Sequence, residues 1–351
     1  MSEPGDEEPG SLPPTELDLE RTAVSQNGDP ENEDPESTHF VGRPDQLPAP
    51  RRATPTGKLG WRTGQLVAGH KVLGKLGKGA SGAVYLVEHL ESGEYRALKA
   101  IPTPDEEARA CFEREVKSQM GAGGHPNVAE CFEAGEWEGH VYLVMEHLPG
   151  GSLRELVRQR GALVGHEAAE VVALLADGLA AVHAVGILHR DLKPANVMFD
   201  AVGVPKLVDF GLARACDAQS QTDALQGTPA YMAPEQTRTA QGTLSEQTDV
   251  YGLGGVLYSA LTGDLPYACS DMLELLLEIA ACDPIPPSER RPELEIPAAL
   301  DAIVLRAMAR SPKERYSSAV EFAKALREYC RENAAEADSP KGTDDGRGYS
   351  S

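Results

Sequence analysis

Residues 189–196 read His-Arg-Asp-Leu-Lys-Pro-Ala-Asn, and three of these side chains could serve the transfer of a phosphoryl group. Asp191 can accept the proton of an attacking hydroxyl, Lys193 can neutralise charge on the transferred phosphate, and Asn196 can hold a metal ion. Asp209, in the triplet Asp-Phe-Gly, offers a second ligand for magnesium. A protein contributes little covalent chemistry to phosphoryl transfer, so positioning and electrostatics of this kind would supply most of the catalysis.

A glycine-rich stretch lies closer to the amino terminus, where Gly77, Gly79 and Gly82 form the pattern G-x-G-x-x-G. In a dinucleotide-binding fold this pattern opens a helix, and by itself it is weak evidence. Here an apolar, β-prone run from Ala83 to Val87 follows the glycines instead. The pattern therefore predicts a β-hairpin whose glycine amides cover phosphates.

Lys99 lies inside an apolar run, 95–101, that is predicted to be the third of three short strands. Its place after the glycine-rich stretch favours a phosphate-binding role over that of a lysine that only solubilises an edge strand. A helix is expected over 105–120, and Glu115 beside its apolar stripe is the expected ion-pair partner of Lys99. Glu113 is the alternative partner.

The remaining elements are predicted from hydrophobic periodicity and turn residues. A buried strand over 141–148 ends at Pro149-Gly150-Gly151, the expected boundary between a β-rich lobe and a helical lobe. Ser152 is the expected N-cap of the first helix of the second lobe, and 197–199 and 206–208 are expected to pair as a hairpin. Helices are expected at 153–160, 166–185, 248–262, 272–281, 297–309 and 317–331.

Composition separates a folded part from two tails. Hydrophobic residues make up 41% of the 351 residues, but Pro, Gly, Glu and Asp dominate the amino-terminal segment. Such a composition cannot bury enough apolar surface to offset the loss of chain entropy on folding. We therefore expect a disordered acidic tail over 1–64, an amino-terminal lobe over 65–148, a carboxy-terminal lobe over 149–332 and a disordered tail over 333–351.

The net charge of −22 argues against nucleic-acid binding, which needs a basic surface. The acidic tail is expected to aid solubility, with a regulatory or docking role as the alternative. The six cysteines are scattered without a C-x-x-C pair, a pattern typical of reduced thiols and not of a metal site or disulfide framework. No hydrophobic run approaches the roughly 18–20 residues that span a bilayer, and the acidic start is unlike a signal peptide. We therefore expect a cytoplasmic protein without a membrane span, which receives its signal in the cytosol.

In this order, the motifs resemble those of the eukaryotic-type (Hanks-type) protein kinases, and closely those of the bacterial Ser/Thr members of that family. The similarity covers roughly residues 68–332. It implies an α+β, bilobal protein-kinase fold with a small β-rich amino-terminal lobe and a larger helical carboxy-terminal lobe. It also implies transfer of the γ-phosphate of ATP to Ser or Thr hydroxyls of proteins in signal transduction, with Mg2+ as cofactor.

The resemblance assigns a role to each residue of the site. The implied catalytic residues are Asp191 as base, Lys193 as a γ-phosphate contact and Lys99 on the α/β-phosphates, and the implied metal ligands are Asn196 and Asp209. The implied ATP-binding residues are Leu76, Gly77, Lys78, Gly79, Ala80, Ser81, Gly82, Val84, Ala97, Lys99, Glu115, Met145, Glu146, Leu148 and Met198. In that set Val84, Ala97 and Met198 would enclose the adenine, Met145 would be the gatekeeper, and Glu146 and Leu148 would offer hinge backbone contacts.

Two further features follow from the resemblance. Glu235, in Ala-Pro-Glu, is expected to pair with Arg315, and Asp249 is expected to be a buried carboxylate that braces the catalytic stretch. Lys193-Pro194 and the segment 227–235 resemble Ser/Thr kinases more than tyrosine kinases.

Arg190, directly before Asp191, marks in this family the kinases that are activated by a phosphate on the activation segment. Thr222, with Ser220 second, is the expected phosphosite, modified by autophosphorylation in trans through self-association. Two other functions remain as alternatives: a nucleotide-binding scaffold that signals by conformation, and a kinase for small molecules. The intact Lys99 and Asp191 argue against the scaffold, and the peptide-docking segment before Glu235 argues against the small-molecule kinase.

Overall fold

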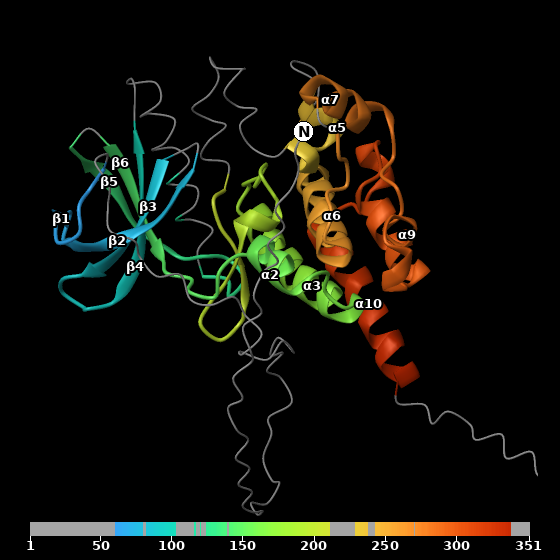
Figure 1. Cartoon of the computed structure of the whole chain (residues 1–351), viewed down its shortest axis with the longest axis horizontal. Coiled ribbons are helices and arrows are strands. Elements are labelled where there is room, and N and C mark those ends of the chain that lie inside the picture. Colours follow the sequence, from blue (N-terminus) through green and yellow to red (C-terminus); the bar gives the residue numbers. More distant parts are fainter. Residues whose placement is uncertain are drawn as a thin grey trace, which may run out of the picture. The chain divides into compact units, whose positions relative to one another are not determined.

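The structure is a computed structural model, and all the residues that it describes belong to one compact unit within His39–Ser351 (Figure 1). The described residues are 60–79, 82–102, 116, 120, 124–138, 140–210, 229–237, 243–269 and 271–337. Outside them lie most of the expected helix 105–120, most of both expected tails, and the site residues Ala80, Ser81, Glu115, Ser220 and Thr222.

The amino-terminal lobe is a six-stranded antiparallel sheet in the order β1-β2-β3-β4-β6-β5. Its strands are β1 (Leu66–Val67), β2 (His70–Gly79), β3 (Gly82–His89), β4 (Tyr95–Pro102), β5 (Cys131–Trp137) and β6 (His140–Glu146). Gly79 at the end of β2 pairs with Gly82 at the start of β3, so the glycine-rich pattern lies in a β-hairpin as predicted. A Cβ on Gly82 would stand 2.1 Å from the carbonyl oxygen of Ala100, and its φ of 137° also favours glycine.

The sheet buries both of its faces, because successive side chains along a strand point to opposite sides. On one face Tyr85 belongs to a hydrophobic cluster that Trp61 covers, with the two ring centroids 5.5 Å apart. On the other face Leu143 belongs to a second cluster together with Val116. Lys99 is the register partner of Leu143, so it belongs to this second face. The fold therefore places the lysine on the side of the sheet from which Trp61 is absent.

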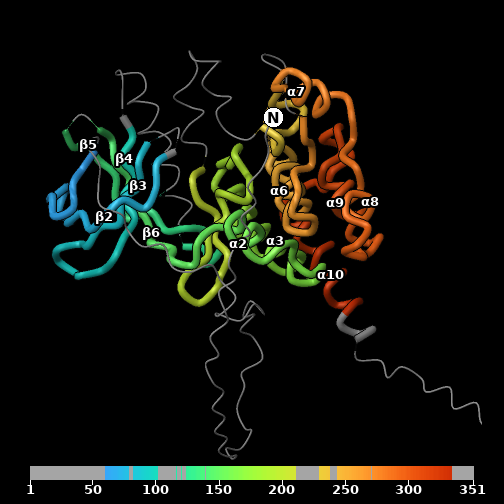
Figure 2. The backbone as a smooth tube through the Cα atoms, viewed as in Figure 1, coloured from blue at the N-terminus to red at the C-terminus, as the bar shows by residue number. Residues whose placement is uncertain are grey.

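The carboxy-terminal lobe is mainly helical and includes one small hairpin of β7 and β8. Its α-helices and strands are α2 (Leu153–Arg160), α3 (Gly165–Ala184), β7 (Val197–Phe199), β8 (Pro205–Leu207), α5 (Pro234–Thr237), α6 (Glu246–Thr262), α7 (Met272–Ala281), α8 (Pro287–Arg290), α9 (Ala298–Ala307) and α10 (Ala319–Ala337). The 3-10 helices among the described residues are η2 (Pro194–Asn196), η4 (Pro229–Tyr231), η5 (Pro292–Leu294) and η6 (Pro312–Glu314). The long helix α3 packs against α10 and α6 (Figure 2).

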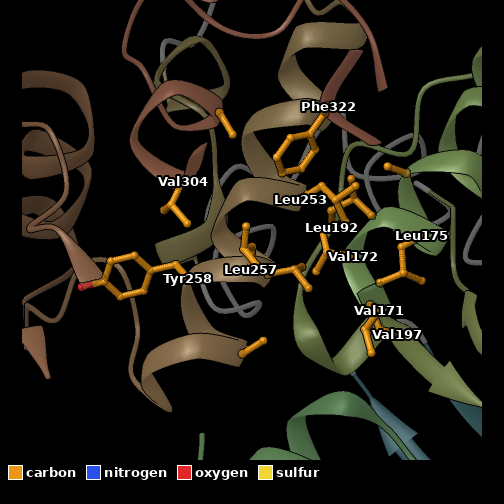
Figure 3. Close-up of a cluster of buried hydrophobic side chains, with 14 of the residues drawn as sticks. Val171, Val172, Leu175, Leu192, Val197, Leu253, Leu257, Tyr258, Val304 and Phe322 are labelled. Carbon is orange, nitrogen blue, oxygen red and sulfur yellow. The ribbon is translucent and has the colours of Figure 1, made fainter. Parts of the chain in front are cut away.

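One hydrophobic cluster forms the core of this lobe, and Figure 3 shows part of it. Val172 of α3, Leu253 of α6 and Phe322 of α10 are all fully buried in the cluster. Leu192, the neighbour of Asp191, also belongs to the cluster. A Cβ on Gly252 would stand 2.9 Å from the Cβ of Leu192, so the glycine lets the chain at Leu192 pack closely on α6. The core thus anchors the chain directly beside the Asp191 carboxylate.

Several predicted elements are confirmed at their bounds. The helices predicted at 153–160 and 272–281 are α2 and α7. Ser152 caps α2 as predicted: its Oγ accepts a hydrogen bond from Glu155 N at 3.3 Å, and the Glu155 carboxylate accepts one from Ser152 N at 2.9 Å. This reciprocal pair satisfies two backbone donors that the helix itself leaves open.

Helix α10 ends later than predicted. It continues to Ala337, past the helix end expected at 331. Ala334, Ala335 and Ala337 are strong helix formers. Intrinsic helix propensity, which apolar spacing does not register, therefore favours the longer helix.

A buried ion pair joins α5 to the segment that precedes α10. The guanidinium of Arg315 donates to the carboxylate of Glu235 at 2.7 and 2.9 Å, and Thr248 Oγ1 donates to the same carboxylate at 2.8 Å. The side chain of Arg315 is fully buried and that of Glu235 is 9% exposed. Burial acts to raise the pKa of Glu235, but the hydrogen bonds and charge of Arg315 outweigh it and hold this pKa below its ordinary value. The pairing that the family resemblance predicts is confirmed.

We expect Glu235→Gln to lower the free energy of unfolding at neutral pH by about 3–5 kcal/mol, because it leaves the buried Arg315 without its counter-charge. Folding lowers the pKa of Glu235, so the stabilisation is present above the usual titration range near about pH 4.3 and is lost as the pH falls through the lower folded value. Urea unfolding at a series of pH values should show the two proteins converging in acid. The exposed control Glu328→Gln should change stability by less than about 0.5 kcal/mol. A difference in the free energy of unfolding between Glu235→Gln and the unaltered protein that stays constant into acid would contradict this role of the Glu235–Arg315 ion pair.

Candidate active site

The catalytic stretch 189–196 lies between α3 and β7, and the buried carboxylate of Asp249 holds its backbone. Asp249, in the first turn of α6, accepts hydrogen bonds from His189 N and from Arg190 N, both at 2.7 Å. The imidazole of His183 lies 2.9 Å from the same carboxylate. Arg190 has a φ of 64°, a left-handed conformation that only surrounding contacts can maintain in a non-glycine residue. The bracing role expected of Asp249 is confirmed.

The Asp191 carboxylate has one oxygen held by two side chains and one oxygen to which no described residue donates. Lys193 Nζ and Asn196 Nδ2 both donate to Oδ2, at 2.6 and 2.9 Å, and Asn196 Nδ2 also lies 2.8 Å from the Asp191 carbonyl oxygen. Within the described part of the chain no residue donates to Oδ1, and the side chain is 36% exposed. An open carboxylate oxygen on a fixed loop is what a base needs in order to reach a substrate proton.

Lys99 and Asp209 connect the sheet to the end of the β7–β8 hairpin region. Lys99 Nζ donates to Asp209 Oδ1 at 2.7 Å, and the lysine side chain is 5% exposed. Burial acts to raise the pKa of Asp209, but the ammonium of Lys99 outweighs it, so this pKa lies below the ordinary value and the carboxylate is ionised at neutral pH. The predicted partner Glu115 lies outside the described residues. Its neighbour Val116 is buried on the face of the sheet that Lys99 shares.

His189 and Phe210 support these two carboxylates without offering proton chemistry of their own. The centroids of the two rings lie 4.8 Å apart, and both residues are buried. Burial lowers the pKa of His189, although the charges of Asp249 and Asp191 act in the other direction. The imidazole is therefore neutral at neutral pH and serves as packing between the stretch 189–196 and the segment that carries Asp209.

The oxygen ligands at the site fit magnesium held together with a phosphate. Among the described residues no group of three or more His, Cys, Asp and Glu side chains could hold a metal ion. Asn196 donates through Nδ2 in both of its side-chain hydrogen bonds, which leaves its Oδ1 available, and Asp209 supplies a carboxylate. Magnesium commonly binds through one or two protein ligands and completes its shell with phosphate oxygens and water.

The residues expected to bind the nucleotide share one face of the sheet. Val84 is the register partner of Lys99, and Ala97, two residues before that lysine, is the register partner of Met145. Residues directly opposite each other in an antiparallel pair point to the same face, so these four side chains lie together. Leu148, which is 6% exposed, has a backbone N–H for which no other described residue is an acceptor. A buried donor of this kind fits a purine nitrogen, because leaving it unpaired would cost free energy.

The remaining nucleotide-site predictions are placed as follows. Leu76, Gly77, Lys78 and Gly79 lie on β2, Gly82 begins β3, Glu146 ends β6 and Met198 is the middle residue of β7.

One contact at this site was missed from the sequence. Lys206 of β8 binds the Glu146 carboxylate at 2.9 Å and so joins the small hairpin to the end of β6. The resemblance implied only a backbone role for Glu146. A single lysine in a three-residue strand has no sequence signal that distinguishes it from a solvent-exposed charge.

Comparisons with known proteins agree with this geometry. The family described as "Protein kinase domain" matches residues 70–328. "Serine/threonine-protein kinase PknB" of Mycobacterium leprae is 36% identical over 257 residues, which cover 70% of this chain and 40% of the relative. The probable serine/threonine-protein kinase CE0033 of Corynebacterium efficiens is 36% identical over 261 residues, which cover 71% and 39% respectively. The chain thus spans about 40% of the length of the curated relatives that it matches.

A solved structure shows the same fold. The crystal structure of Rad53 1–466 in complex with AMP-PNP matches with a TM-score of 0.62 and 25% identity, covering 75% of this chain and 65% of that one. Among the helices that the structure describes, none is both long and apolar enough to cross a membrane.

We expect Lys99→Met to raise the pKa of Asp209, because the burial that opposes ionisation would then act without the ammonium. NMR titration of the side-chain carboxyl carbons, with Asp209 assigned through Asp209→Asn, measures this directly. The exposed Asp271, which caps α7, is the internal reference and should titrate alike in both proteins. An unchanged pKa of Asp209 would mean that Lys99 is not the group that keeps it ionised.

Proposed function

The chain belongs to the protein kinase family, and on that premise we propose that it is a Mg-ATP-dependent serine/threonine protein kinase. The observation that supports the proposal most directly is the Asp191 carboxylate, whose Oδ2 is bound by Lys193 and Asn196 and whose Oδ1 has no donor among the described residues. The Lys99–Asp209 pair adds a cation for phosphate and a carboxylate for metal. The similar PknB and CE0033 proteins are themselves named as serine/threonine kinases.

In the proposed reaction Asp191 Oδ1 accepts the proton of a serine or threonine hydroxyl. The hydroxyl oxygen bonds to the γ-phosphorus while the bond from that phosphorus to the bridging oxygen breaks, and ADP leaves with the bonding electron pair. Lys193, held 2.6 Å from Asp191, offers positive charge to the phosphoryl group during transfer. Both side chains are fixed in advance by the loop, so little reorganisation accompanies the transfer.

The nucleotide would be held by residues of both lobes. Lys99 would contact the α/β-phosphates, and Asn196 Oδ1 and the Asp209 carboxylate would hold Mg2+. Magnesium, when bound, neutralises charge on the phosphates. The N–H of Leu148 would donate to the purine, and Val84 and Ala97 would pack on its ring from the sheet.

Proteins are the proposed substrates, for the reason that the segment 227–235 resembles a peptide-docking platform. A scaffold role would not need an open Asp191 oxygen or an ionised Asp209, so the geometry favours catalysis. A kinase for small molecules remains the second candidate, and a generic protein substrate distinguishes the two. Cytoplasmic location, self-association and the domain limits at 65, 149 and 332 remain predictions from the sequence.

We expect Asp191→Asn to reduce phosphate transfer to a generic protein substrate by about 10²–10⁴-fold, the usual contribution of a positioned base. Binding of Mg-ATP, followed by calorimetry, should persist because neither Asn196 nor Asp209 is altered. Asp271→Asn is the matched control: Asp271 caps α7 far along the chain from the site, and asparagine caps a helix equally well. Full transfer by Asp191→Asn would overturn the assignment of the base, and the absence of any transfer by the unaltered protein would overturn the proposed function.

The unaltered protein, incubated with Mg-ATP, is expected to carry phosphate on Thr222, with Ser220 as the second candidate site. A phosphate there would add about −1.5 to −2 charges, which Arg190 can neutralise. Mass spectrometry of the unaltered protein and of Asp191→Asn measures this, since only the former should be modified. Active protein with both residues unmodified would contradict the prediction.

A further inference from the structure

Gln236, at the end of the Ala-Pro-Glu-Gln run, makes two hydrogen bonds that point in different directions. Its Oε1 accepts from Ala233 N at 2.9 Å, and its Nε2 donates to the carbonyl oxygen of Arg190 at 2.9 Å. The first bond lies within the short helix α5 and its cap. The second joins α5 to the catalytic stretch, across 46 positions of sequence.

The bond through Oε1 is a helix cap. Gln236 is the third residue of α5 (Pro234–Thr237), and a Gln or Glu at that position commonly accepts from the N–H of the capping residue. A glutamate would make this bond at least as well, because the carboxylate also interacts favourably with the helix amino terminus. This half of the interaction thus needs only an acceptor.

The bond through Nε2 acts on the peptide that leads into Asp191. Asp249 holds the N–H groups of His189 and Arg190, so it fixes the chain up to Arg190. The carbonyl of Arg190 belongs to the next peptide, which it shares with Asp191 N. Among the described residues, the contact of that N–H is to Nδ1 of His189, at the long distance of 3.4 Å. Within the described part of the chain, Gln236 therefore makes the shorter hydrogen bond to this peptide.

The backbone conformation of Arg190 explains why the hydrogen bond from Gln236 to its carbonyl oxygen is important. With a φ of 64° its backbone lies in a region that costs free energy for a residue with a side chain. Rotation of the peptide after Arg190 would relieve that cost and would turn Asp191 with it. Gln236 can resist the rotation because its neighbour Glu235 is anchored by the buried Arg315.

We propose that Gln236 is a positioning residue, whose Nε2 bond to the Arg190 carbonyl fixes the peptide that aims the Asp191 carboxylate at the substrate hydroxyl. The inference rests on the proposed kinase activity. In this proposal the end of the activation segment contacts the catalytic stretch directly through Gln236. This contact does not depend on a phosphate on Thr222. Gln236 acts through Arg190 and touches no reacting atom.

Two substitutions separate this role from helix capping. Q236E keeps the acceptor for Ala233 N and removes the donor for the Arg190 carbonyl, which would then face a carboxylate. We expect kcat for a protein substrate to fall about tenfold, KM for ATP to stay within about twofold, and the melting temperature to be unchanged or higher. Q236A removes both bonds and should lower kcat and the melting temperature together.

Thr237→Val is the matched control in the same helix. It removes a hydrogen bond from Thr237 Oγ1 to the Pro234 carbonyl, which lies within α5, and it should leave kcat unchanged. Q236E with a wild-type kcat, beside an active unaltered protein, would overturn the positioning role and leave the kinase proposal standing. A lower kcat of Q236E accompanied by a lower melting temperature equal to that of Q236A would also overturn it, because the loss would then be structural. If the unaltered protein transfers no phosphate, both proposals fail together.

Discussion

The site depends on one buried carboxylate, that of Asp249. It is 1% exposed, and burying an ionised carboxylate is costly unless donors surround it. Its donors are the backbone N–H groups of His189 and Arg190, with His183 beside them. The first turn of a helix, where Asp249 lies, also favours negative charge. The catalytic stretch therefore takes its shape from a core helix, α6, and not from local preferences of its own residues.

Around the backbone that Asp249 holds, the charged side chains of the site form pairs of opposite charge. Lys193 lies against Asp191 and Lys99 against Asp209, so each carboxylate has an ammonium within 2.7 Å. The ammonium of Lys99 outweighs burial and holds the pKa of Asp209 below its ordinary value. The ammonium groups of Lys99 and Lys193 also have the charge that phosphates require. When a nucleotide binds, its phosphates would replace the carboxylates as partners of Lys99 and Lys193, which are already in place.

Regular structure followed from local patterns wherever those patterns were strong. The capping residue Ser152 and the apolar spacing after it predicted α2 at its observed bounds, and the helix predicted at 272–281 is α7. Helix α10 ran beyond its predicted end, since alanine has a high helix propensity that apolar spacing does not register. The G-x-G-x-x-G pattern was interpreted correctly as a hairpin because β-prone residues follow it.

The sequence by itself indicated which residues could form the site and what chemistry they could perform. Asp191, Lys193 and Asn196 occur in one short stretch, so their proximity needed no knowledge of the fold. Only the tertiary structure decided that Lys99 meets Asp209, 110 positions away, and that Gln236 reaches the Arg190 carbonyl. Contacts of that kind depend on how whole elements pack, whereas spacing and periodicity report only on neighbours along the chain. Short sequence motifs therefore indicate which side chains could act, whereas the fold decides which distant residues contact them.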